Sequence, residues 1–205
     1  MVTKIETPII VEGEQRKEKL GLIHLITGNG KGKTTSSLGL AVRAIGTGYK
    51  VHMIQFLKSG GTGELYATKH LPNFTIEQFG VDAWKERQKT QTSLLGKDST
   101  GHFVFQPDTL EREAARQGFL AAQAIIRSGE YDVVILDEIN CVLDKGIIPL
   151  NEIVELITHN GTTEILLTGR DAPQELYQYA DYISIIDGVK HPWQKGIRAR
   201  RGIEY

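Results

Sequence analysis

The sequence predicts an α/β fold with a mostly parallel central sheet and helices on both of its faces. Short apolar segments alternate with segments of helical periodicity along most of the 205-residue chain. Several apolar segments are continuous, such as Val133-Val134-Ile135-Leu136, which is typical of strands that are covered on both faces. Because parallel strands are joined through helical crossovers, this alternation favours a parallel sheet.

The expected elements follow from these patterns in chain order. Apolar, β-branched segments predict strands over 21–26, 50–56, 74–79, 131–137, 163–168 and 182–187. Helical periodicity predicts helices over 34–45, 63–70, 107–128, 149–159 and 173–180. Two of these helices have clear start signals. Pro107-Asp108-Thr109 precedes Glu111 in one, and Pro149 and Asn151 precede an apolar pattern over 153–157 in the other.

Two segments lie outside this alternation. Residues 1–20 are polar and aperiodic, so they predict an N-terminal arm, with a disordered end as the alternative. Residues 81–102 are rich in Lys, Gln, Thr, Ser and Gly and show no sustained period, which indicates an insertion. We therefore expect an arm over 1–20 and a single α/β domain over 21–205.

Composition argues against several classes of protein. The formal net charge is −1 and the pI is about 6.6, without the basic surface that a nucleic-acid binder needs. Cys141 is the one cysteine, so no intramolecular disulfide can form and a reducing compartment is favoured. No apolar run approaches the roughly 20 residues that span a bilayer, and residues 1–20 are too charged for the apolar core of a secretory signal. We expect a cytoplasmic protein with no membrane and no nucleic-acid partner.

A phosphate-binding loop is predicted directly after the first strand. The segment from Thr27 to Thr35 is Thr-Gly-Asn-Gly-Lys-Gly-Lys-Thr-Thr, between an apolar strand and a helix, which is the context of a P-loop. Glycines let consecutive backbone N–H groups point at one anion, and the helix N-terminus adds positive charge. Lys33 supplies a cation for the phosphates, and the Thr34 hydroxyl is suited to Mg²⁺.

The loop departs from the usual pattern in one position. Thr27 stands where the first glycine is expected, so the loop from Gly28 is one residue short. The alternative interpretation is a glycine-rich turn with no ligand. A second element supports the functional interpretation, since the strand over 131–137 ends in Asp137 and Glu138, as in a Walker B segment that delivers an acid to Mg²⁺. Taken alone, such a carboxylate pair is equally typical of a solvated strand end.

These residues by themselves predict an enzyme that uses Mg²⁺ and ATP. No Arg/Lys-rich lid of a small-molecule kinase is evident, although Arg198, Arg200 and Arg201 form a small cluster. Further motifs resemble the corrinoid adenosyltransferases of cobalamin biosynthesis, over roughly residues 21–80 and 103–205. Besides the loop, the resembling segments are 43–46, 55–58, 134–138, 167–170, 180–181, 190–192, 196–197 and 202–205.

The resemblance implies a RecA-like P-loop fold and a particular use of ATP. In this family, Co(I) of a reduced corrinoid attacks the 5′ carbon of ATP, so that an adenosyl-corrinoid forms and tripolyphosphate leaves. The chain is thus expected to be a cob(I)yrinic acid a,c-diamide / cob(I)alamin adenosyltransferase, acting in cobalamin biosynthesis or salvage. The family is also understood to hold ATP in the reverse direction along the loop. A donor reductase and a homodimer, in which the N-terminal arm covers the partner's site, are implied in the same way.

Site residues follow from the resemblance position by position. The cradle of the triphosphate is assigned to Gly28, Asn29, Gly30, Lys31, Gly32, Lys33, Thr34 and Thr35. Thr34 and Glu138 are the expected Mg²⁺ ligands with Asp137 close by, and Lys33, Thr34 and Glu138 are the expected catalytic residues. Arg43 and Arg170 are expected near the phosphates, each with a surface arginine as the alternative.

The corrinoid side rests on an aromatic pair. In the family, Phe-x-Trp after the third strand contacts the corrin and excludes the axial ligand. Phe103 and Phe105 align with this pair, and Trp84 is the rival position. His191 is expected to be a structural histidine, because the reaction requires the lower axial position of cobalt to be empty.

Two other functions stay open at this point. A P-loop kinase or NTPase acting on another small molecule would produce ADP instead of tripolyphosphate. A nucleotide-binding relative that has lost catalysis would bind ATP without turnover, and Phe105 together with the 81–102 insertion keeps this alternative open.

Overall fold

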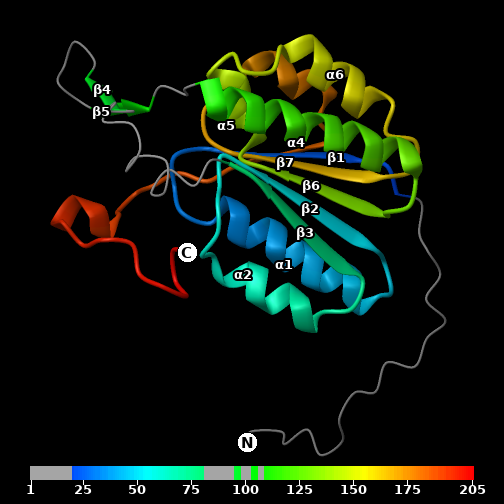
Figure 1. The fold of residues 1–205 in the computed structure, drawn as a ribbon, viewed down its shortest axis with the longest axis horizontal. Helices are drawn as coiled ribbons and strands as arrows, with labels where there is room; N and C mark the ends of the chain where they lie inside the picture. Colours follow the sequence, from blue (N-terminus) through cyan, green and yellow to red (C-terminus); the bar gives the residue numbers. More distant parts are fainter. Residues whose placement is uncertain (1–19, 81–94, 98–102, 106–108) are drawn as a thin grey trace, which may run out of the picture.

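The computed structural model describes residues 20–80, 95–97, 103–105 and 109–205. Its centre is a six-stranded sheet in the order β3-β2-β6-β7-β1-β8, and every neighbouring pair in it is parallel (Figure 1). The strands are β1 (Ile23–Thr27), β2 (Val51–Phe56), β3 (Phe74–Phe79), β6 (Val133–Asp137), β7 (Glu164–Thr168) and β8 (Tyr182–Ile185). This is the P-loop-type α/β architecture that the sequence predicts.

Helices cover both faces of the sheet. Helices α4 (Thr109–Ser128), α5 (Ile139–Asp144) and α6 (Leu150–Thr158) lie on one face, and α1 (Lys33–Gly46) and α2 (Gly63–Ala67) lie on the other (Figure 1). A separate apolar cluster fills each side. Every residue of β2, β6 and β7 is buried, as expected for continuous apolar strands in the middle of a covered sheet.

The structure differs from the expected elements in a few places. The segment over 173–180 forms the 3-10 helix η2 (Gln174–Tyr179) instead of an α-helix, and the predicted helix over 63–70 ends in the 3-10 turn η1 (Thr68–His70). Helix α5 and the 3-10 turn η3 (Pro192–Lys195) were not predicted. Strand β8 is at the sheet edge with all four residues exposed, and it stops at Ile185.

The predicted insertion contains one described strand. Strand β4 (Leu95–Lys97) pairs antiparallel with β5 (Phe103–Phe105) in a small separate sheet. Residues 1–19 of the expected 1–20 arm, Trp84 and most of the 81–102 segment lie outside the described residues. Among the helices that the structure describes, none is long and apolar enough to cross a membrane.

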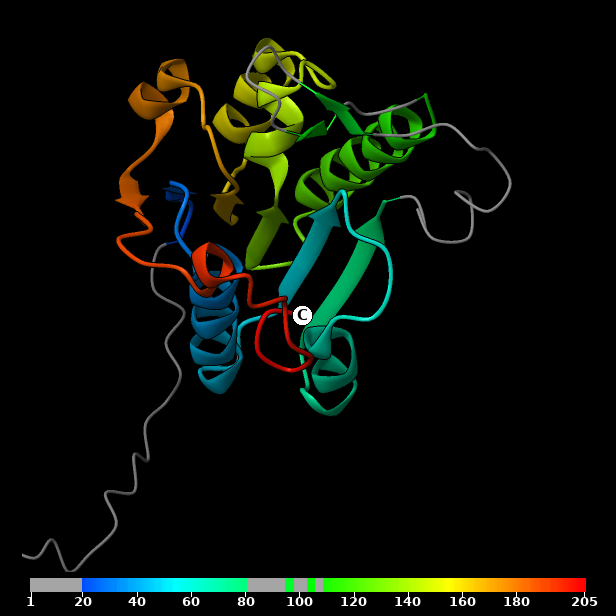
Figure 2. The same ribbon diagram turned by 90° about the vertical axis from the view of Figure 1, so that its left-hand side faces the viewer.

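The topology brings four functional segments to one end of the sheet. The loop between β1 and α1, the loop after β2, the Asp137-Glu138 pair after β6 and Arg170 after β7 all follow carboxyl ends of parallel strands. The C-terminal segment returns to the same end and lies between α1 and α2 (Figure 2). Ligands of open α/β sheets bind at this edge, so the candidate site is located here.

Candidate active site

The loop between β1 and α1 is held in shape by backbone close to β8. Gly28 and Gly32 have φ angles of 103° and 128°, which side chains of L-residues rarely adopt. The Gly30 N–H donates to the Ile186 carbonyl at 2.7 Å, and the Gly188 N–H donates to Asn29 Oδ1 at 2.8 Å. A Cβ at Gly28 would lie 2.4 Å from the Ile186 oxygen, so this approach requires glycine.

Lys33 lies inside the curl of this loop. Its buried side chain donates from Nζ to the Gly28 and Gly30 carbonyl oxygens, each at 2.8 Å. Burial lowers the pKa of the Lys33 ammonium, and the negative charge of Glu138 opposes that shift. The ammonium is thus near the N-terminus of α1, where an anion would also meet the positive end of the helix.

Asp137 is the buried centre of the polar network beside the loop. Its Oδ1 accepts from the Thr34 hydroxyl at 2.8 Å and from the Thr168 hydroxyl at 2.6 Å. Its Oδ2 accepts from Gln55 Nε2 at 3.0 Å and from Lys58 Nζ at 2.6 Å. The Asp137 carboxylate has no exposed surface, and these donors satisfy both of its oxygens.

Glu138 has a conformation that turns the chain away from β6. Its φ of 66° is left-handed, and its N–H donates to the Thr168 hydroxyl at 3.2 Å before α5 begins. The Cys141 thiol donates to Glu138 Oε2 at 3.0 Å. Burial, followed by the charge of Glu138, raises the pKa of Cys141 to about 12, so the thiol stays protonated near neutral pH. The turn places the Glu138 carboxylate on the pocket wall, whereas Asp137 stays buried behind it.

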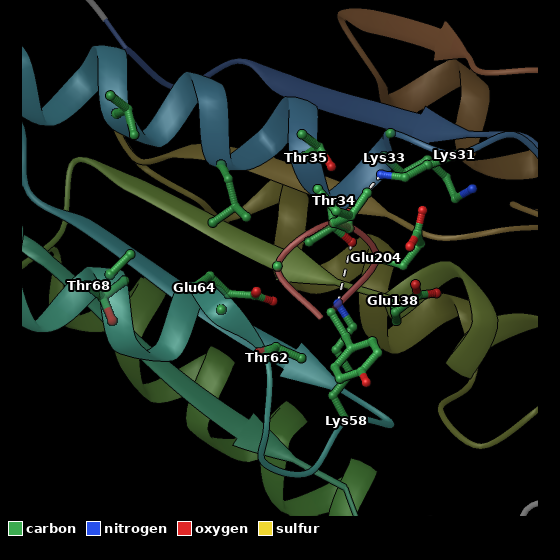
Figure 3. Close-up of a pocket in the computed structure, with 18 of the residues that line it drawn as sticks. Lys31, Lys33, Thr34, Thr35, Lys58, Thr62, Glu64, Thr68, Glu138 and Glu204 are labelled. Carbon is green, nitrogen blue, oxygen red and sulfur yellow. Dashed lines mark hydrogen bonds between the residues drawn. The ribbon is translucent and has the colours of Figure 1, made fainter. Parts of the chain in front are cut away.

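A pocket of about 760 Å³ extends from the loop to α2. Figure 3 shows Lys31, Lys33, Thr34, Thr35 and Lys58 around one end of it. The other end is lined by apolar side chains from α1 and from the α2–β3 region: Leu38, Val42, Ala67, Leu71 and Phe74. The pocket therefore suits a ligand with one strongly anionic part and one apolar part.

The C-terminal segment forms part of this pocket. Residues 202–205 line it, and Lys31 Nζ donates to the Ile203 carbonyl at 3.0 Å. Arg200 and Glu204 hold the segment in a turn through an ion pair of 3.0 Å. Arg170 and His191 line this pocket and also a neighbouring one of about 520 Å³.

The structure brings most of the predicted site residues together. Residues 29–35, Glu138 and Arg170 line the pocket, with Gly28 and Asp137 directly behind it. Arg43 is an exception, because it is exposed in the last turn of α1 and does not line the pocket. The helix carries Arg43 about 15 Å along its axis from Lys33, at 1.5 Å per residue. Phe103 and Phe105 lie on β5, and their side chains lie outside the described part of the chain.

Sequence reasoning assigned no role to three residues that the site contains. Lys58 and Glu64 come from the loop and helix that follow β2, and Gln55 is buried at the end of β2. Gln55 Nε2 also donates to Glu64 Oε1 at 2.9 Å, which links the Asp137 network to α2. The available signal was their position at or after the end of a predicted buried strand, at the edge of the sheet that also carries Asp137.

The donor set fits one divalent cation of the Mg²⁺ type. No group of three or more His, Cys, Asp or Glu side chains gathers within the described ranges. Mg²⁺ usually needs only one or two protein ligands together with phosphate oxygens and water. Thr34 Oγ1, Asp137 and Glu138 supply oxygen donors beside the loop, and the ammonium of Lys58 already occupies a cation position between Thr34 and Asp137.

Comparison with known proteins assigns the chain to a family. Residues 19–205 match the family model described as ATP:corrinoid adenosyltransferase BtuR/CobO/CobP. The chain belongs to this family. It is 32% identical over 197 residues to the corrinoid adenosyltransferase of Escherichia coli (strain K12), covering 93% of this chain and 89% of that protein.

Two further relatives agree with the family assignment. The corrinoid adenosyltransferase CobA of Salmonella typhimurium is 29% identical over 208 residues, covering 98% of this chain and 94% of its own. The corrinoid adenosyltransferase of a Sinorhizobium species is 31% identical over 193 residues, covering 93% of this chain and 83% of its own. The similarity to the corrinoid adenosyltransferase family therefore covers nearly the whole chain, beyond the separate motifs recognised in the sequence.

Proposed function

We propose that the protein transfers the adenosyl group of ATP to the cobalt of a reduced corrinoid. Co(I) donates an electron pair to the 5′ carbon of ATP, the Co–C bond forms and the C5′–O bond breaks. The bonding electrons leave with the triphosphate, and cobalt becomes formally Co(III). The observation that carries this proposal, beside family membership, is the anion cradle of residues 28–35 at one end of a partly apolar pocket.

The cradle suits a reaction whose leaving group is the complete triphosphate. Negative charge develops on the departing oxygen, and preorganised donors aimed at such charge lower the barrier. Backbone N–H groups of the loop, the Lys33 ammonium and the exposed guanidinium of Arg170 would face this charge. A divalent cation held by Thr34, Glu138 and Asp137 would neutralise part of the same charge when it is bound.

The remaining parts of the proposal rest on the resemblance and on composition. We place Mg²⁺ at Thr34, Glu138 and Asp137, the corrin against Phe103 and Phe105, and the protein in the cytoplasm as a homodimer supplied with electrons by a reductase. Cob(I)alamin and its a,c-diamide precursor are the proposed corrinoid substrates. Light scattering measures the dimer directly, and Phe105→Ala tests the corrin contact through the KM for the corrinoid.

The decisive experiment supplies ATP, Mg²⁺ and chemically reduced cob(I)alamin or cobinamide to the purified protein. A light-sensitive Co–C product and one equivalent of tripolyphosphate are expected. Release of ADP would indicate a kinase, and ATP binding without turnover would indicate a non-catalytic relative. Either of those outcomes would contradict the proposal.

A paired substitution tests the site itself. Lys33→Ala should abolish product formation while the circular dichroism spectrum stays native. The two hydrogen bonds that the substitution removes go to carbonyl oxygens of the loop that carries the lysine. Lys69→Ala is the matched control, since Lys69 is exposed on η1 above the Tyr66 ring and lies outside the pocket. A fully active Lys33→Ala variant would refute the assignment of the phosphate site.

A further inference from the structure

The Lys58 ammonium contacts two of the predicted metal ligands, Asp137 and Thr34. Its Nζ lies 2.6 Å from Asp137 Oδ2. It also lies 3.4 Å from Thr34 Oγ1, and Figure 3 shows these two side chains pointing toward each other. Its side chain is 23% exposed, whereas that of Asp137 is 0% exposed, so the ammonium reaches the carboxylate from the pocket side. The distances place this ammonium where a cation would bind both oxygen donors.

A buried carboxylate requires a compensating charge. Gln55 and the hydroxyls of Thr34 and Thr168 donate to Asp137, but they are neutral. Within the described part of the chain, Lys58 is the one cation in contact with this carboxylate. Removing such a partner without replacing its charge leaves a buried anion, which is strongly unfavourable.

The ammonium and a divalent cation cannot share this position. Both need Asp137 and the Thr34 oxygen, and like charges at such short separation repel strongly. A cation that binds there must therefore displace the Lys58 ammonium. The displaced group stays in the pocket, because Lys58 is attached to its wall opposite the phosphate loop.

The backbone of the segment that carries Lys58, residues 57–61, is held at both ends, and the Lys58 side chain extends from this segment. Leu57, Gly60 and Gly61 have positive φ angles of 57°, 62° and 73°. The Gly60 N–H donates to Gln78 Oε1 at 2.6 Å, and the Leu57 N–H donates to the Phe79 carbonyl at 2.9 Å. The backbone is thus anchored to β3, while the four-carbon stem of lysine lets the ammonium change partners.

We propose that Lys58 exchanges with the divalent cation: its ammonium neutralises Asp137 before metal binds, and afterwards it binds the triphosphate of the nucleotide. This deepens the proposed function, since the triphosphate is the leaving group of that reaction. Without metal and nucleotide, the Lys58 ammonium supplies the one positive charge beside Asp137. With both bound, the divalent cation takes this position, and the Lys58 ammonium binds the phosphates together with Lys33. Lys58 therefore lowers the affinity for free metal and raises the affinity for the anion.

Opposite shifts of two affinities test this exchange. Lys58→Met removes the ammonium and keeps the stem, so it should tighten Mn²⁺ binding without nucleotide by about tenfold, measured by electron paramagnetic resonance. The same variant should bind tripolyphosphate with Mg²⁺ roughly tenfold more weakly by calorimetry. Lys69→Met, an exposed lysine on η1, should change neither affinity. A lysine with a purely structural role would weaken both, and that result or an unchanged Mn²⁺ affinity would overturn the proposal.

Lysine labelling of the wild-type protein gives a test that does not depend on folding of the variant. Acetylation of Lys58, followed by mass spectrometry, should accelerate when Mn²⁺ alone is added and slow again when tripolyphosphate is added with the metal. A rate that is unaffected by Mn²⁺ would overturn the exchange. None of these measurements uses a corrinoid, so their failure is distinct from failure of adenosyl transfer.

Discussion

Gly28→Ala is expected to damage both the stability and the nucleotide site of this protein. Gly28 has a φ of 103°, which alanine adopts only with strain. A Cβ at this position would lie 2.4 Å from the oxygen, 2.8 Å from the nitrogen and 2.9 Å from the carbon of the Ile186 backbone. Since these neighbours are backbone atoms, no side-chain rotation relieves the overlap, and either the loop or the segment after β8 must move.

The size of the effect follows from the two costs. The strained backbone conformation costs roughly 1–3 kcal/mol, and overpacking typically costs about as much again. A total of about 4 kcal/mol would lower the melting temperature by about 8–16 °C for a domain of this size. The shift also separates the Gly30 N–H from the Ile186 carbonyl, now 2.7 Å apart, so the amides of the cradle turn and ATP affinity should fall at least about tenfold.

Gly39→Ala is the matched control for this prediction. Gly39 is exposed within α1, and a Cβ there meets nothing within 4 Å. Alanine should stabilise the helix by about 0.5–1 kcal/mol and leave ATP binding unchanged. Thermal unfolding by circular dichroism and calorimetric titration with Mg·ATP measure both quantities. If Gly28→Ala melts and binds ATP like the wild type, the close approach of the loop to Ile186 is not a constraint and the reasoning is refuted.

Two further predictions concern titratable groups. Burial lowers the pKa of His52 from 6.5 to about 4, so the unfolded chain binds the additional proton between these values. The free energy of unfolding should therefore fall by about 3 kcal/mol as the pH drops from 6.5 to 4. Urea titrations at several pH values measure this dependence. The decrease in the free energy of unfolding between pH 6.5 and 4 should be much smaller in His52→Phe and unchanged in His70→Phe, and equal decreases in both variants would contradict the prediction. Because the pKa of Cys141 is raised to about 12, iodoacetamide should alkylate the native thiol far more slowly than the urea-unfolded thiol at pH 8–9. Glu138→Gln should accelerate the native reaction, and an unchanged rate would show that the Glu138 charge does not act on the thiol.

The inner strands β6 and β7 could be predicted from sequence because burial on both faces leaves continuous apolar segments. All six expected strands exist, and their boundaries differ from the predicted ones by at most two residues. Their order in the sheet could not be predicted, since pairing between β1 and β7 joins segments about 140 residues apart, and no local pattern carries that information. Helix α5 was missed because it has only six residues and follows the left-handed Glu138 directly, with no conventional start signal.

Site residues that directly follow predicted strands could be predicted from sequence. Residues whose place in the site depends on the order of strands or the direction of a helix could not. Thr34 and Asp137 were expected to lie together, and their side chains are 2.8 Å apart. Arg43 was expected near the phosphates from the family resemblance, but the helix carries it away from the pocket. Lys58 was seen as part of a family-like segment and received no role, because its contact with Asp137 depends on the neighbouring positions of β2 and β6 in the sheet.

The short phosphate loop has a structural explanation in strand β1. Thr27, which occupies the position of the usual first glycine, is the buried last residue of β1 and pairs with Ile185 of β8. Its hydroxyl accepts a hydrogen bond from the Ala172 N–H at 3.2 Å, so this position belongs to the sheet and the loop begins only at Gly28. The shorter loop is held in place by the backbone of Ile186, whose carbonyl oxygen accepts a hydrogen bond from the Gly30 N–H. The glycines and lysine of the motif therefore predict that an anion binds, whereas the shape of the cradle depends on a segment more than 150 residues further along the chain.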